Sequence, residues 1–141
     1  MEFNGRLEMK DINQLLKDRG LQDTGPVQKF IDSEVIRLMS PYIPMRDGML
    51  DKSAAISTVI GSGLVRQEAP HVRFQYYGKV MVDPETGSPF AGKGVKKVLT
   101  DKDLMHDKSR HPQAGPFWFE RMKADKQEDI LEGSRKVAGA K

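Results

Sequence analysis

The residues of this sequence that could bind a metal are its three histidines, His71, His106 and His111. His106 and His111 flank Asp107, and imidazole and carboxylate groups are common ligands of zinc and other transition metals. However, Pro112 follows His111, and no ordered helix would hold the pair at a ligand spacing. The pattern is not that of a metal centre, and we expect no metal site.

Nucleophilic chemistry and phosphate binding also have little support. The chain has no cysteine, so it forms no disulfide, no thiolate metal site and no thiol nucleophile. The glycine-flanked turn at 61–63 is too short for a phosphate-binding loop, and no lysine follows it. Ser53, Ser57 and Ser62 have no histidine nearby in the sequence that would activate a hydroxyl. We therefore expect no enzyme activity, no catalytic residue and no cofactor.

The composition is typical of one modest domain covering residues 1–141. Hydrophobic residues make up 38% of the chain, aromatic residues 7% and charged residues 30%. No apolar run approaches the roughly 18 residues of a membrane span, and the N-terminus lacks the basic and apolar regions of a signal peptide. We expect a soluble protein that is not exported by a signal peptide.

Charge is close to balanced, with 23 basic and 20 acidic residues and a formal net charge of +3. The two signs alternate along most of the chain, whereas nucleic-acid binding usually needs basic residues gathered on one face. Two small basic groups, at 93–97 and 135–141, are typical of a solvated loop and a chain end. A small nucleic-acid-binding or regulatory protein is therefore only the alternative interpretation.

Four segments have the end signals of helices, at residues 11–19, 26–40, 70–78 and 116–137. In the second, apolar residues recur at three- and four-residue steps and predict a buried stripe. This stripe consists of Val27, Phe30, Ile31, Val35, Leu38 and Met39. Polar residues, Asp32 among them, are expected on the opposite, solvent-facing side.

Strand signals are weaker and lie in the middle of the chain. Residues 53–60 are β-prone and stop at the glycines of 61–63, so a hairpin with a return strand at 64–68 is the economical interpretation. Residues 79–115 hold a short strand at 80–82 and turn residues at 83–87, but no sustained pattern. We interpret 79–115 as a long loop or hairpin excursion from the core. The fold class is then α+β, with helices packed on a small antiparallel sheet and a flexible tail at 138–141.

Two groups of residues are candidates for contacts with other subunits. The apolar content of the excursion is too thin to order it alone, so its scattered large side chains are expected to be buried against a neighbour after assembly. These are Val95, Val98, Leu99, Leu104 and Met105. Tyr76 and Tyr77 either pack in the core with one hydroxyl at the surface or form an aromatic contact with a neighbouring subunit.

Three segments together carry a family resemblance. The first runs from Pro44 through Asp47, Gly48 and Leu50 to Ser53; the second is Ala69–Tyr77; the third, Phe117–Ala124, reads F-W-F-E-R-M-K-A and contains Trp118. In this order, they resemble segments of the minor capsid, or head–tail joining, proteins of long-tailed bacteriophages. The second and third segments look most like those of minor capsid proteins encoded by phages and prophages of Gram-positive bacteria. The sequence departs from the broader family in lacking Thr before the glycine of the first segment and in the length of 79–115.

The resemblance implies a structural virion protein of the phage neck, which joins the DNA-filled head to the tail as an oligomeric ring at the connector. Its implied partners are copies of itself, the adjacent head-closure protein, and tail-terminator or tail-tube proteins. Transient, non-specific contact with genomic DNA is also implied, and contact with a membrane is not. Such a protein is made in the cytoplasm of the bacterial host and resides in the virion. The resemblance implies neither a cofactor nor catalytic residues.

Overall fold

The computed structural model of the chain describes residues 2, 11–45 and 47–139. Arg46, and residues 140 and 141 of the expected tail, lie outside them. Along the chain the elements are α1 (Ile12–Asp18), α2 (Pro26–Met39), the 3-10 turn η1 (Ser40–Tyr42), α3 (Met49–Ser57), α4 (Val72–Tyr77), β1 (Lys79–Val82), β2 (Val98–Asp103) and α5 (Trp118–Val137). The predicted α+β class is confirmed.

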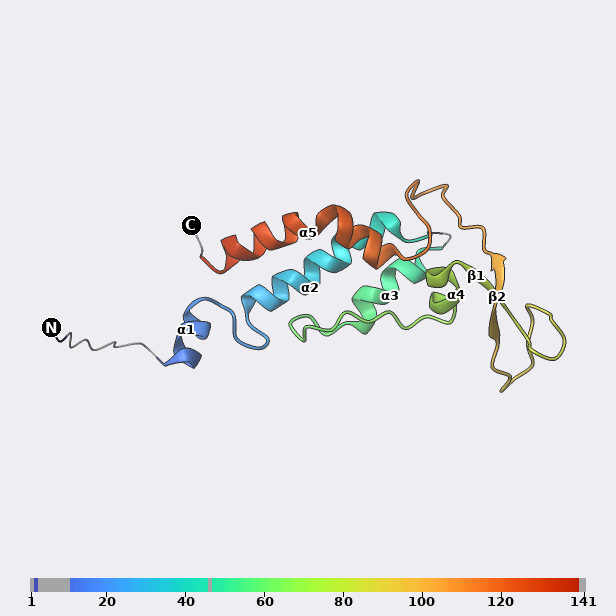
Figure 1. Cartoon of the computed structure of the whole chain (residues 1–141), viewed down its shortest axis with the longest axis horizontal. Helices are drawn as coiled ribbons and strands as arrows, with labels where there is room; N and C mark the ends of the chain where they lie inside the picture. The colour runs from blue at the N-terminus through green and yellow to red at the C-terminus, as the bar shows by residue number, and fades with distance from the viewer. Residues whose placement is uncertain (1, 3–10, 46, 140–141) are drawn as a thin grey trace.

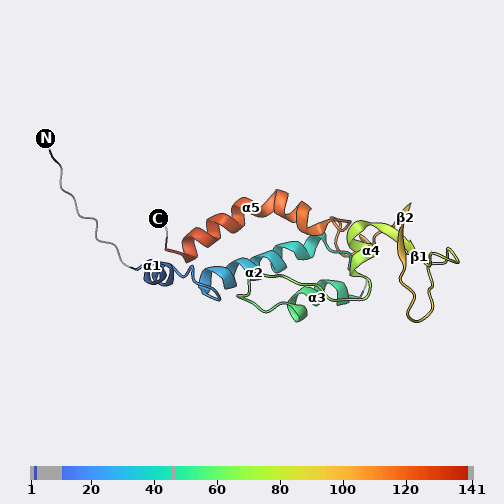
Figure 2. The same ribbon diagram turned by 60° about the horizontal axis from the view of Figure 1, so that its bottom comes forward.

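The molecule is elongated, with α2 and α5 side by side along its length (Figure 1). α1 lies near one end, and the β1–β2 hairpin projects at the other. Turning the molecule by 60° keeps the hairpin at that far end, beyond α4 (Figure 2). The sheet is therefore a projection from the helical body, and the helices pack mainly on one another.

The helices α1, α4 and α5 begin and end close to the residues that the sequence predicts. The Asp11 side chain caps α1 by accepting a hydrogen bond from the backbone N–H of Asn13. α4 ends at Gly78, which adopts a left-handed φ of 67° that other residues rarely adopt. α5 begins two residues after Pro116 and ends at Val137. A side-chain cap thus marks the start of α1, and a left-handed glycine marks the end of α4.

The predicted hairpin at 53–68 is wrong. Residues 49–57 form α3, which begins after Gly48, and the Asp47 carboxylate accepts a hydrogen bond from the N–H of Met49. No strand forms at 64–68; the Thr58 side chain instead bonds both the N–H and the C=O of Arg66. Hydrogen bonds to the Thr58 side chain therefore take the place of the backbone hydrogen bonds expected between two strands.

The core lies where α2, η1, α3 and α5 meet. Its fully buried apolar cluster consists of Met39, Tyr42, Ile43, Ala54, Trp118 and Met122. Phe30 of α2 packs so closely on α5 that a Cβ atom added at Gly133 would lie 2.4 Å from its ring. The predicted α2 stripe does face inward, with Val27 and Met39 buried and its other members half-buried.

Asp32 corrects the expected polar face of α2. It is only 2% exposed. Its Oδ2 accepts hydrogen bonds from the N–H groups of Gly61 and Gly63 at 2.8 and 3.1 Å, and its Oδ1 accepts one from Gln28 at 2.8 Å. The carboxylate therefore holds the loop after α3 against α2.

The excursion has two parts with different environments. Residues 79–103, which we call the arm, contain β1 and β2 paired antiparallel, with Met81 opposite Leu99 and Val82 opposite Val98. Residues 104–117, the return segment, lie back on the body, where the buried Gly115 donates from its N–H to the Tyr42 carbonyl at 3.3 Å. The predicted excursion over 79–115 is therefore too long, because its last third is anchored.

Candidate interaction surface

The arm is a two-stranded hairpin, and no third strand from the described part of the chain pairs with it. Thr100 donates from its hydroxyl to the Val80 carbonyl at 2.7 Å, and Lys79 forms an ion pair with Asp103 at the base. That ion pair lowers the pKa of Asp103, chiefly through the hydrogen bond from Lys79. Isolated two-stranded hairpins are marginally stable in water. The arm is therefore suited to gaining stability from an external partner.

The far half of the arm, residues 88–97, forms its tip. Phe90 in the tip is 85% exposed, next to Pro89. Lys93, Lys96 and Lys97 follow, and no acidic residue occurs between 86 and 100. None of these lysines forms an ion pair with a described residue. The tip thus combines an exposed aromatic ring with unpaired positive charge.

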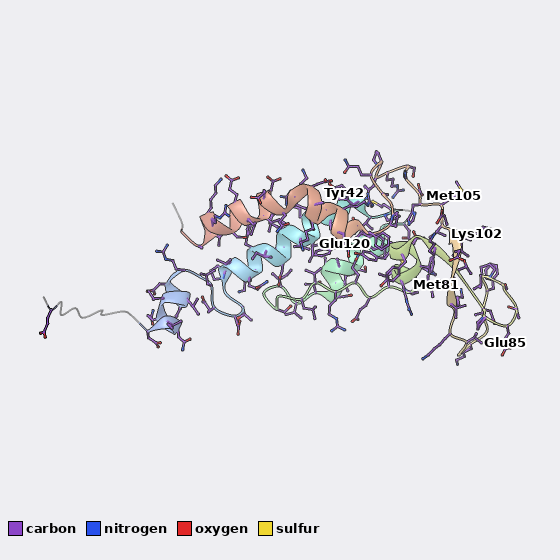
Figure 3. All side chains as sticks on the ribbon, viewed as in Figure 1. Tyr42, Met81, Glu85, Lys102, Met105 and Glu120 are labelled. Carbon is purple, nitrogen blue, oxygen red and sulfur yellow. The ribbon has the colours of Figure 1, made fainter. Side chains whose placement is uncertain are left out.

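A shallow depression of about 850 Å³ opens between the return segment and the start of α5. Leu104, Pro112 and Phe117 supply apolar surface, while Lys108 and Asp125 carry charge at this site. Figure 3 labels Met105 on the return segment and Tyr42 on the helical body. The same picture places Met81, Glu85 and Lys102 on the arm, away from the long axis of α5.

Arg121 fixes the shape of this depression. Its guanidinium donates to the carbonyls of Pro116 at 2.7 Å, Gln113 at 2.8 Å and Tyr42 at 3.4 Å. It also lies over the Tyr42 ring, 5.4 Å from the ring centre. One cation therefore ties the return segment to both η1 and α5.

Tyr42 adds a pH-sensitive bond to this network. Its hydroxyl donates to Asp125 at 2.6 Å. That hydrogen bond, together with burial and the carboxylate charge, raises the pKa of Tyr42 above its ordinary value of 10.0. The protonated phenol therefore stabilises the fold below about pH 10, and this stabilisation is lost as the pH rises through the folded-state pKa.

Tyr42→Phe tests this bond. We expect a loss of about 1 kcal/mol in the free energy of unfolding at neutral pH, because the hydrogen bond to a charged acceptor is removed. The difference in the free energy of unfolding between wild type and variant should shrink above about pH 10, where the wild-type phenol ionises. Urea unfolding across this range measures both quantities. A free-energy difference that stays constant up to high pH would contradict the role given to the hydrogen bond between Tyr42 and Asp125.

The outer face of α5 carries a row of exposed carboxylates that starts at the depression. Asp125, Glu128, Asp129 and Glu132 are spaced so that they share one face of the helix. Glu132 pairs with Lys136 at 3.4 Å, whereas Glu128 and Asp129 have no ion pair within the described part of the chain. We call these four residues the acidic row.

The residues proposed from the sequence are distributed over three places. The first group, Asp47, Gly48 and Leu50, lies around the start of α3. Asp47 is exposed, Gly48 is buried and Leu50 packs against the core. Leu104 and Met105 lie on the return segment, where Leu104 is half-buried and Met105 is 95% exposed. Val95, Val98 and Leu99 are exposed on the arm. The structure therefore places these candidates on three separate parts of the molecule: the start of α3, the return segment and the arm.

The three aromatic candidates, Trp118, Tyr76 and Tyr77, differ in how deeply they are buried. Trp118, expected at an interaction surface, is wholly buried, so it supports the fold instead. Tyr76 packs edge-on against Trp118, with ring centres 4.8 Å apart, and its hydroxyl donates to Glu120. Tyr77 remains 44% exposed beside Phe117. Tyr76 therefore packs against the core, and Tyr77 is available at the surface.

Comparisons with known protein families, curated proteins and solved structures find no match.

The three histidines have separate surroundings. His106 Nε2 bonds the Gln75 carbonyl at 2.7 Å, and His111 Nδ1 bonds the Ile43 carbonyl at 2.7 Å. His71 lies edge-on to Phe74. Within the described residues, no three potential metal ligands gather at one point, and no helix is long and apolar enough to cross a membrane. His106 and His111 thus anchor the return segment to the body.

Sequence reasoning missed Phe90 and the acidic row. A large aromatic residue inside a turn-rich stretch is a signal for exposure, and the three- and four-residue spacing of the carboxylates was also readable. The lack of a periodic pattern in the excursion hides the first signal, and the mixture of positive and negative residues in α5 hides the second.

Proposed function

We propose that this chain is a structural protein of the bacteriophage neck, which joins the filled head to the tail as an oligomeric ring. The observation that carries the proposal is the arm, a projecting hairpin with uncovered apolar side chains on a slender helical body. A subunit of a ring needs a surface that it offers to its neighbours, and the arm provides one. The segments that resemble head–tail joining proteins support the same role.

Other exposed apolar side chains also favour an assembling subunit. No residue of α1 is buried, and Ile12, Leu15 and Leu16 remain accessible. Met49 and Ile56 of α3 are likewise exposed. Contiguous apolar surface on a soluble protein commonly marks an interface. Adjoining head-closure and tail proteins are the proposed partners of these surfaces.

Deletion of the gene from a phage that encodes this chain tests the role. We expect filled heads and free tails to accumulate unjoined in lysates viewed by electron microscopy, because the adaptor between them is missing. Complementation from a plasmid should restore joined particles. Normal yields of joined, infectious particles without the gene would refute the proposal, and empty heads alone would indicate a packaging role instead.

A further inference from the structure

We propose that the tip of the arm of one copy docks into the depression beside α5 of a second copy. The proposal rests on the neck function in one respect, since it names the contact that would build the ring. Its physical basis is separate: an exposed aromatic residue, lysines without ion pairs among the described residues, and a hollow from which the acidic row of α5 extends.

The apolar part of the contact is a ring entering a hollow. Phe90 is 85% exposed. The depression has about 850 Å³ of space and presents carbon atoms of Leu104, Pro112 and Phe117. Aromatic anchors that fill pockets dominate the energetics of many protein interfaces. Phe90 is therefore the proposed anchor.

The charged part of the contact follows along α5. The tip carries Lys93, Lys96 and Lys97, none of which forms an ion pair with a described residue, and the acidic row begins at Asp125 on the rim of the depression. Opposite potentials of this kind steer association and fix its register. This complementarity identifies the occupant as a second copy of the chain, because the arm supplies positive charge for Glu128 and Asp129, which have no ion pair among the described residues.

The reach of the tip decides which lysine can meet the row. The chain turns at 92–95, where the N–H of Val95 donates to the Gly92 carbonyl, so Lys96 and Lys97 follow after a change of direction. A helix rises about 1.5 Å per residue, so the acidic row from Asp125 to Glu132 is about 10 Å long. Three residues span at most about 10 Å, so with Phe90 in the depression Lys93 is within reach of the row.

The contact joins two different surfaces, so it is head-to-tail. In both views the arm points away from α5 of its own chain (Figures 1 and 2), which favours docking on another copy. Repetition of a head-to-tail contact gives a closed ring or an open filament, depending on the rotation between neighbours.

A charge-swap experiment tests the contact with the purified full chain. The arm variant is Lys93→Glu/Lys96→Glu/Lys97→Glu, and the helix variant is Glu128→Lys/Asp129→Lys/Glu132→Lys. We expect wild type to self-associate in sedimentation velocity at low salt, and each variant to associate at least about tenfold more weakly. An equal mixture of the two variants should recover association, because each arm then meets a face of opposite charge.

Controls separate this contact from a general charge effect. Lys17→Glu/Lys52→Glu/Lys123→Glu changes the net charge by the same amount as the arm variant, at exposed positions elsewhere, and should associate like wild type. Phe90→Ala should weaken association without lowering the free energy of unfolding, since the ring is exposed in the monomer.

Three results would overturn the proposal: a wild-type chain that remains monomeric, variants that associate like wild type, or a mixture that does not recover. Loss of duplex DNA binding in the arm variant, with self-association unchanged, would reassign the tip to nucleic acid. None of these outcomes alters the lysate test, so the copy-to-copy contact and the neck role can fail independently.

Discussion

Trp118→Ala is expected to lower the free energy of unfolding by about 3–5 kcal/mol, a large fraction of the stability of a small domain. The indole is 0% exposed, and few large side chains share its core. Its Nε1–H donates to Gln67 at 2.9 Å, and Tyr76 packs on its face. Truncation would therefore open a cavity and detach α4 from α5.

Urea unfolding followed by circular dichroism measures this loss. Trp118→Phe keeps an aromatic ring in the cavity and should lose less than Trp118→Ala. Phe90→Ala removes a ring of the arm that is 85% exposed and should leave the unfolding transition unchanged. An alanine variant at Trp118 within about 1 kcal/mol of wild type would show that the core lies elsewhere.

Asp32→Ala is expected to cost about 3 kcal/mol, because it leaves the buried N–H of Gly61 without an acceptor and removes a second bond to Gly63. Both backbone groups bond the same oxygen, Oδ2. Asp32→Asn can keep a carbonyl oxygen at that position and should lose about 1 kcal/mol or less. The pair of variants separates the need for an acceptor from the need for a charge.

Two measurements report on Asp32. Urea unfolding gives the loss in stability, and amide hydrogen exchange at Gly61 and Gly63 gives the state of the loop. Fast exchange at both amides is expected in the alanine variant and protection is expected in the asparagine variant. Equal losses in the two variants would mean that the negative charge, rather than the acceptor, holds the loop.

Helix ends were the most predictable part of this fold. Asp11, Gly78 and Pro116 lie at or next to boundaries of α1, α4 and α5, because capping and ring constraints act within a few residues. The hairpin of the excursion was also anticipated, although not the position of β2. Local chemistry was enough to predict these features.

α3 shows why β propensity misled the prediction. Ile56 within α3, and Thr58 and Val59 just after it, favour a strand, yet Leu50, Ser53 and Ala54 face the core at helical spacing. Two of those three residues are small, so the inward face was not visible as an apolar stripe. Packing against the core then outweighed the preference of the exposed residues.

Asp32 and the return segment depend on contacts between distant parts of the chain. The sequence pattern assigns Asp32 to the polar face of α2, but the loop around Gly61 covers its side chain and donates a hydrogen bond to it. The return segment is anchored by Arg121, His106 and His111, whose partners are backbone carbonyls. Carbonyls are present at every residue, so a sequence pattern cannot identify such partners.

Addition of purified chain to lysates of the gene-deleted phage tests the neck role most directly. Filled heads and free tails in the lysate should become joined, infectious particles in proportion to the added chain. The Lys17→Glu/Lys52→Glu/Lys123→Glu control protein should restore joining as well as wild type. If added wild-type chain leaves heads and tails separate, or if the untreated lysate already contains joined particles in normal yield, the chain is not the protein that joins them.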